Sequence, residues 1–422
     1  MNYKFYIYIF LFFSVLSIQA EAQEEPVINE DSLRSQAIRI FIDCHRCDMD
    51  YIRREVPYVN YVRDVKEAQV YVLVTQQQTG SGGREYTITY IGQEEFAGLN
   101  DTLVYHSNPD DTDDNIREGS TKMFSLGLMR YVARSALYDQ VEINHLGITE
   151  EVEVVDNWDN WVFEIDFDPE IELEESRKSI NFDNSINASR ITHALKYEFG
   201  ADMRFRETKY IYSDTTYISN RNSWGVDNLL VFSLSDHWSA GVRTDLSSST
   251  YRNIKASFDF TPSVEYNIFP YSESTRRQLR MLYGIGYSYN NYIDTTIYDK
   301  TEEHLLEQSL DIAYRVQQKW GSVNISLEAS TYLHDLSKNR IELDGWMSIR
   351  IIKGLSLSLR GGVARINNQI TLPKEGADEA EVLLRLQELR TAYSIDASVG
   401  FTYTFGSIYN NIVNPRFGNG RY

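Results

Sequence analysis

Apolar and polar residues alternate along much of the second half of this 422-residue chain. Between Arg190 and Arg206, the odd positions from Ile191 to Phe205 are nearly all apolar, and the even positions are mostly polar or charged. Successive side chains on a strand point to opposite faces, so the alternation predicts a strand with one apolar and one polar face. The stretch is about twice as long as a usual soluble strand. Strands of this kind are typical of membrane barrels, where lipid lies on one side and a polar lumen on the other.

Alternating segments of similar length continue to the end of the chain and predict a transmembrane antiparallel β-barrel of about ten strands over residues 188–406. Their connections alternate between short and long, the longest being 368–391. Outer-membrane barrels keep short periplasmic turns and longer outside loops. Lipid offers the backbone no hydrogen-bond partners, so such a sheet is expected to close on itself. The ten predicted strands lie near 190–207, 222–235, 238–250, 253–268, 278–291, 304–318, 322–334, 340–352, 355–367 and 392–405.

The same alternation assigns a set of charged residues of both signs to the interior of the barrel. A narrow interior with mixed charges favours a plug of ion pairs over an open pore. Trp224, Trp238, Trp320 and Trp346 suit the interfacial aromatic girdles, with ordinary sheet packing as the alternative. For Trp346, strand parity leaves the lumen open as a second position. The predicted interior residues are Lys196, Glu198, Asp202, Arg204, Arg243, Asp245, Asp259, Glu265, Arg280, Glu307, Asp311, Arg315, Glu328, Asp344, Arg350, Arg360 and Asp396.

The first half of the chain has the pattern of a small α/β domain over residues 36–148. An apolar, β-prone run precedes a helix-like segment that stops at Pro57, and a strand hairpin and a closing helix follow. The expected elements are strands at 37–42, 68–75 and 84–92 and helices at 48–55 and 113–134.

The remaining segments are expected to carry no fold of their own. Residues 1–22 have the basic start, apolar run and small-residue site of a secretory signal peptide, with cleavage after Ala22. Residues 149–187 are rich in acids, which indicates a solvated linker with one short strand at 161–167; a cation or partner site is the alternative. Residues 407–422 are expected to form a periplasmic tail.

Together these patterns resemble two known groups of envelope proteins. The alternating region resembles a Gram-negative outer-membrane β-barrel, with Tyr403 and Phe405 at the end of the last strand. The order of elements before it is similar to the periplasmic domains of TolB-like and CsgG-like envelope proteins. The resemblance implies a cell outer-membrane protein with a periplasmic amino-terminal domain.

Cys44-His45-Arg46-Cys47 is the one local motif with known reactivity. In an oxidising periplasm two cysteines at this spacing favour a structural disulfide. A catalytic dithiol at the helix start and a metal site are the alternatives, although a second Cys pair for zinc is missing.

The sequence indicates where the protein is located more clearly than what it does. The net charge of −20 argues against nucleic-acid binding. No catalytic or cofactor signature stands out, so we expect a non-enzymatic outer-membrane barrel that anchors the α/β domain for contact with an envelope partner. A narrow channel for small solutes is one alternative. A membrane-embedded lipid-modifying enzyme is another, with a lipid-facing His193 as its candidate. The helical spacing at 378–390, in the longest loop, suggests a lid, a partner-binding helix or a packed loop element.

Overall fold

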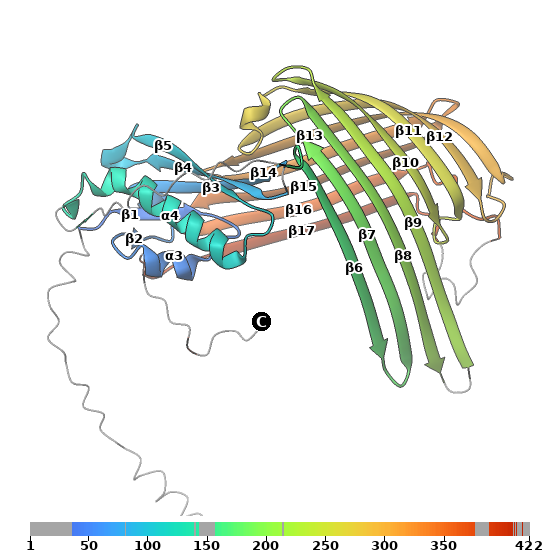
Figure 1. The fold of residues 1–422 in the computed structure, drawn as a ribbon, viewed down its shortest axis with the longest axis horizontal. Coiled ribbons are helices and arrows are strands. Elements are labelled where there is room, and N and C mark those ends of the chain that lie inside the picture. Colours follow the sequence, from blue (N-terminus) through green and yellow to red (C-terminus); the bar gives the residue numbers. More distant parts are fainter. Residues whose placement is uncertain are drawn as a thin grey trace, which may run out of the picture.

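The computed structural model describes residues 36–80, 82–138, 141–142, 157–212, 215–375 and 388–407, with Tyr409, Asn411 and Arg416. The expected signal peptide, most of the tail and most of the helical segment in the longest loop lie outside these residues. The described chain forms a small α/β domain and a large antiparallel sheet (Figure 1).

The α/β domain is a five-stranded sheet in the order β2-β1-β3-β4-β5, with two α-helices. β1 is parallel to β2 and β3, and β3, β4 and β5 form antiparallel pairs. Of these strands, β2 and β5 were missed from the sequence. The bounds are β1 Arg39–Asp43, α3 Met49–Glu55, β2 Asn60–Tyr61, β3 Val70–Gln78, β4 Arg84–Gly92, β5 Asn100–Ser107 and α4 Asp113–Val132.

The core of this domain lies between its sheet and α4. Phe124, Leu128 and Tyr131 of α4 are fully or almost fully buried, as are Ile88 and Tyr90 of β4. The Tyr90 hydroxyl donates to the carbonyl of Met123 on α4 at 2.9 Å, which satisfies its polar end. A separate apolar core supports the prediction of an independent domain.

The large sheet contains twelve strands, each antiparallel to the next along the chain, with β6 and β17 at its two edges. Both ends of the sheet carry mostly short connections, and the longest, 367–392, lies at the end opposite the β13–β14 and β15–β16 turns; the expected alternation of short and long connections holds only in part. Figure 1 shows the sheet strongly curved, with β6–β9 running at a steep angle to β14–β17 in this view. The bounds are β6 Trp161–Leu173, β7 Arg177–Ile191, β8 Leu195–Tyr212, β9 Thr215–Ser233, β10 Trp238–Ser249, β11 Ile254–Asn267, β12 Arg277–Tyr292, β13 Glu302–Gln318, β14 Gly321–Tyr332, β15 Asp335–Ile352, β16 Leu355–Ile366 and β17 Tyr393–Tyr403.

Two sequence expectations about this sheet are wrong. The strand count is twelve rather than about ten, and β6 and β7 occupy most of the region 149–187 that was assigned to an acidic linker. The acids of β6 alternate with apolar residues: Glu164, Asp166 and Asp168 share one face, opposite Phe163 and Ile165. Their register against β7 is continuous, so the acids belong to a polar face and not to a solvated linker.

Burial in the large sheet is inverted relative to a soluble protein. Large apolar side chains lie exposed on one face, including Ile165 at 76%, Val399 at 64% and Phe401 at 68%. Many of its most buried side chains are instead polar, such as Ser179 and Asn267, and lie on the opposite face. Soluble domains bury their apolar faces against another layer. The described residues place no second layer on the apolar face of this sheet.

Within the described residues, no helix is both long enough and apolar enough to cross a membrane.

Candidate functional site: the junction between the α/β domain and the sheet

The α/β domain lies against the end of the large sheet that carries the β13–β14 and β15–β16 turns (Figure 1). Its β1 and the segments around β2 and β3 face the turns β13–β14 and β15–β16. Side chains from segments about 300 residues apart in the sequence meet there, so the site is formed only by the tertiary fold.

Arg350, near the end of β15, makes the central contact of this junction. Its Nη2 lies 2.9 Å from Oδ2 of Asp43 at the end of β1, with side-chain exposures of only 25% and 13%. Its Nη1 donates to the carbonyl of Lys319 at 2.9 Å, and its guanidinium lies 5.2 Å from the centre of the Phe41 ring. The guanidinium is thus held by a carboxylate, a carbonyl and an aromatic face at once.

Asp43 is held in turn by a tyrosine of the same domain. The hydroxyl of Tyr71 on β3 donates to Oδ2 of Asp43 at 2.8 Å, and the Tyr71 ring stacks on Phe41 with centres 6.2 Å apart. Burial, followed by the nearby charge of Asp43, raises the pKa of the Tyr71 phenol. The phenol therefore stays protonated and remains a donor to the carboxylate through the physiological range.

The short turns themselves supply further polar contacts to the domain. Oδ2 of Asp64 accepts a hydrogen bond from the backbone N–H of Gly354 at 2.5 Å. Gly354 has a φ of +73°, a conformation that glycine adopts without strain, which lets the turn present its N–H. Lys353 forms an ion pair with Glu67, and Nζ of Lys319 donates to Gln93 at 3.2 Å. Burial lowers the pKa of Lys319.

The segment after the last strand also contacts the domain. Oδ1 of Asn411 accepts from the backbone N–H of Tyr61 at 2.7 Å, and its Nδ2 donates to Oδ1 of Asn60 at 2.9 Å. An isolated antiparallel bridge joins Val62 to Tyr409. The tail therefore extends the edge of the domain at β2, a role that the sequence did not indicate.

The opposite side of the domain reaches the first strands of the sheet. The turn between β3 and β4 brings Gly80 so close to β7 that a Cβ there would lie 2.4 Å from the carbonyl oxygen of Ile191. A Cβ on Gly82 would lie 3.1 Å from the Val162 side chain at the start of β6. The domain thus touches β6 and β7 as well as the turns around β14 and β15.

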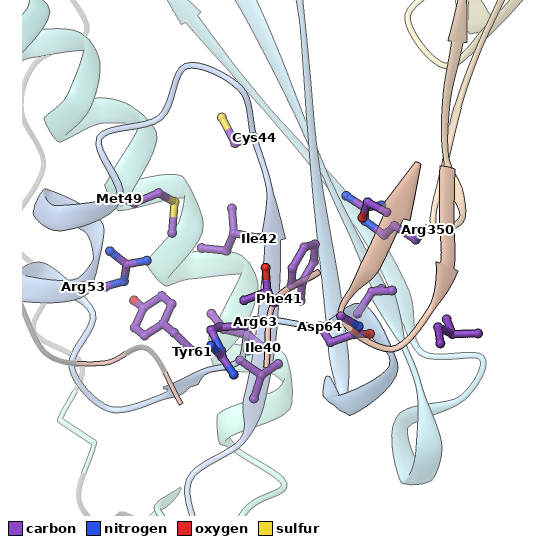
Figure 2. A pocket seen from close by; sticks show the side chains of 16 residues that line it. Ile40, Phe41, Ile42, Cys44, Met49, Arg53, Tyr61, Arg63, Asp64 and Arg350 are labelled. Atoms are coloured by element: carbon purple, nitrogen blue, oxygen red, sulfur yellow. The ribbon is translucent and has the colours of Figure 1, made fainter. Parts of the chain in front are cut away.

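Two cavities lie between the domain and the sheet. The first, of about 310 Å³, is lined by β1, the β2 region and the turn beyond Arg350. Figure 2 shows Arg53, Met49 and Tyr61 on the domain side of this cavity and Arg350 across from them. The second, of about 460 Å³, lies between the Cys44–Arg46 loop, the end of β3 and the polar face of β12–β15.

The Cys44-His45-Arg46-Cys47 motif lies at this junction. The two sulfurs are bonded at 2.01 Å, with Cα atoms 5.7 Å apart. Cys44 lines both cavities, and His45 and Arg46 of the loop closed by the bond line the second. Within the described residues no group of three or more His, Cys, Asp or Glu side chains could hold a metal ion.

The other residues singled out in the sequence have clear positions. His193 lies exposed in the turn between β7 and β8, so its expected place on a lipid-facing strand is wrong. Trp346 lies on the polar face and lines the second cavity. The strand register places the predicted interior charges on that same face. Ion pairs join some of them, including Arg280 with Asp311 at 2.8 Å.

Comparison with known proteins adds no family at this point. No protein-family model matches the chain, and no curated protein matches it. The functional argument therefore rests on the geometry of the sheet and of the junction.

Proposed function

We propose that this chain is a non-enzymatic outer-membrane protein whose sheet closes into a twelve-stranded barrel and holds the α/β domain at its periplasmic mouth for contact with an envelope partner. The observation that carries the proposal is the inverted burial of the sheet, combined with a domain fixed to the end opposite the longest connection, 367–392. Outer-membrane barrels turn their short connections to the periplasm. The expected signal peptide is consistent with export to that compartment.

Closure through β6 and β17 follows from the physics of the membrane. Unpaired backbone groups at these edges would be costly in lipid. Both strands carry apolar residues at odd positions, such as Ile165 and Phe401, so pairing them continues the apolar face without interruption. An even number of strands also makes the two edges antiparallel, so the start of β6 and the end of β17 then lie on the same, periplasmic side.

The closure is tested by cysteine cross-linking in isolated outer membranes. A cysteine replacing Ile165 on β6 is combined in turn with cysteines replacing Val399, Phe401 and Tyr403 on β17. We expect one of the three pairs to form a disulfide, because one register must be adopted. A cysteine at Ile312 on β13 serves as the matched control that should not cross-link to Ile165→Cys. A chain that fractionates as soluble, with no β6–β17 cross-link, would contradict the proposal.

The anchoring role is supported by the breadth of the junction. The domain is held by turns of β13–β16, by the tail and by the start of the sheet, which leaves its α4 and β5 side uncovered. Leu126 on α4 is 53% exposed and Val104 on β5 is 43% exposed. A photo-reactive amino acid at either position should capture a protein partner in intact cells, whereas one at the apolar-face residue Val363 should not. If neither Leu126 nor Val104 yields an adduct, that result would count against a partner on this side.

A narrow channel is the second candidate, and the two cavities at the junction are the observation that favours it. They are spaces left between the domain and the sheet, which supports a path for small solutes past the domain. Planar-bilayer recording separates the two functions: an anchor with an occupied mouth should be silent, and a channel should show discrete conductance steps. The hypothesis of a lipid-modifying enzyme loses its lipid-facing candidate residue, because His193 lies in a turn.

A further inference from the structure

A row of directly paired side chains crosses the polar face of the sheet beneath the second cavity. Gln278 lies opposite Arg315, Arg315 opposite Asn324, and Asn324 opposite Trp346. Adjacent strands are about 4.8 Å apart, so these four residues form a continuous track across β12–β15. All four line the second cavity.

The cavity has a charge unlike that of the chain as a whole. The protein carries 61 acidic residues, yet none of them lines this cavity. Arg315 contributes a guanidinium from the sheet, and Arg46 contributes one from the disulfide loop of the α/β domain. Among the described residues neither forms an ion pair or a side-chain hydrogen bond, in contrast to Arg350 and Arg280. Two uncompensated cations in one concave space favour an anionic ligand.

The rest of the lining is rich in amides and hydroxyls and contains two aromatic rings. Trp346 and Tyr86 supply the rings, and their faces suit the C–H surface of a sugar ring. The hydroxyls of a saccharide match side chains that both donate and accept hydrogen bonds. The volume of about 460 Å³ is within the range of small-ligand sites, roughly 300–1,000 Å³. The amide lining residues are Gln76, Gln77, Gln278, Gln317 and Asn324.

The track continues beyond the cavity along the same face. Asn324 and Trp346 also line a neighbouring hollow of about 230 Å³ that contains Arg360. Asp344 and Asp396 line that hollow too, so its two carboxylates outnumber its one guanidinium. The uncompensated charge is therefore confined to the part of the track that the α/β domain covers.

We propose that the second cavity is a binding site for a carboxylated saccharide, shared between the α/β domain and the sheet. Arg315 and Arg46 bind the carboxylate, Trp346 packs on a sugar ring, and the amides bind its hydroxyls. The site exists only when the domain is docked, because Arg46 and Gln76 come from one unit and Arg315 and Trp346 from the other. The binding site does not depend on whether the barrel conducts.

The test uses the purified full-length chain in detergent, with trigalacturonic acid and neutral maltotriose as probes in isothermal titration calorimetry. We expect trigalacturonic acid to bind and maltotriose to bind much more weakly. Arg315→Gln and Arg46→Gln should each weaken trigalacturonic acid binding by about tenfold or more, the effect of losing a charged hydrogen bond. Arg46 lies on an exposed loop, so its replacement leaves the fold intact.

Arg243→Gln is the matched control, since Arg243 lies on the same polar face but on β10, outside the cavity. Unchanged binding in this variant supports the site. The proposal is overturned if trigalacturonic acid does not bind, if maltotriose binds as tightly, or if Arg243→Gln weakens binding as much as Arg315→Gln. These outcomes leave the β6–β17 cross-link and the bilayer recording unaffected, so the binding site and the proposed function fail separately.

Discussion

Replacing Arg350 with glutamine should loosen the α/β domain from the sheet without unfolding either. The change removes a charged hydrogen bond of 2.9 Å to Asp43, a second one to a backbone carbonyl and the contact with the Phe41 ring. Hydrogen bonds to charged groups contribute about 1.5–3 kcal/mol. Because both side chains keep some solvent contact, we take about 2 kcal/mol, which corresponds to about a 30-fold shift in the docking equilibrium.

The backbone amide of Gly354 reports this equilibrium, because its acceptor is the Asp64 side chain of the other unit. Hydrogen exchange followed by mass spectrometry on the detergent-solubilised chain should show faster exchange at Gly354 in Arg350→Gln, by up to about 30-fold. Asp43→Asn should have a similar effect, and the double variant should add little, because both changes break one contact. Arg340→Gln is the control, since Arg340 lies on the same strand but pairs with Glu342. Unchanged exchange at Gly354 in Arg350→Gln, or an equal rise in Arg340→Gln, would refute the reasoning.

Three further predictions concern the domain and its attachments. Asn411→Ala removes the acceptor of the Tyr61 amide, so hydrogen exchange at Tyr61 should become about fivefold faster, as expected for the loss of about 1 kcal/mol. An unchanged exchange rate would show that Asn411 does not stabilise the β2 edge. Gly127→Ala places a Cβ about 2.1 Å from the Tyr90 ring, so the urea midpoint of the α/β domain should fall by an amount equivalent to about 1–3 kcal/mol; an unchanged midpoint would mean that α4 shifts freely. The pKa of Tyr71 is raised in the folded state, so its contribution to stability is complete below its ordinary pKa of 10.0 and is lost as the pH rises above that value. Tyr71→Phe should therefore lose less stability than the parent chain in urea titrations at alkaline pH, and parallel curves would contradict this.

Local sequence patterns were enough to predict most helices and strands of the α/β domain. The hairpin of β3 and β4 and the helix α4 occur close to their expected positions, because each combines regular periodicity with clear end signals. β5 was missed because its sequence, Asn100–Ser107, is mostly polar and short of apolar residues. It is an edge strand whose pairing with β4 depends on tertiary context and not on its own propensity.

The error at β6 and β7 has a different cause. Both strands show two-residue alternation, but the acids of β6 and the serines and asparagines of β7 gave that region the composition of a linker. Composition averages the two faces of a strand, whereas alternation separates them. In a sheet whose polar face is as charged as this one, alternation is the more reliable signal.

The candidate site could not be read from the sequence at all, because it depends on contacts between distant segments. Asp43 and Arg350 are 307 residues apart, and neither position has a local signal that points to the other. The sequence did place Arg350 and Arg315 on the polar face, and gave that face as the alternative for Trp346, since parity along a strand is a local property. The docking of the α/β domain on the sheet decides which of these side chains contact the domain.

The way the domain is attached limits the surfaces on which a partner could contact it. The contacts described at the junction use β1, the β2 edge, the β3–β4 turn and the loops near them, so these surfaces are already covered. A partner must therefore meet the domain on the side of β5 and α4, whose outer edge carries no further strand among the described residues. A ligand in the second cavity, which both units line, would strengthen the attachment, because it binds only the docked state. Binding in the cavity would thus favour the orientation in which the uncovered side faces the periplasm.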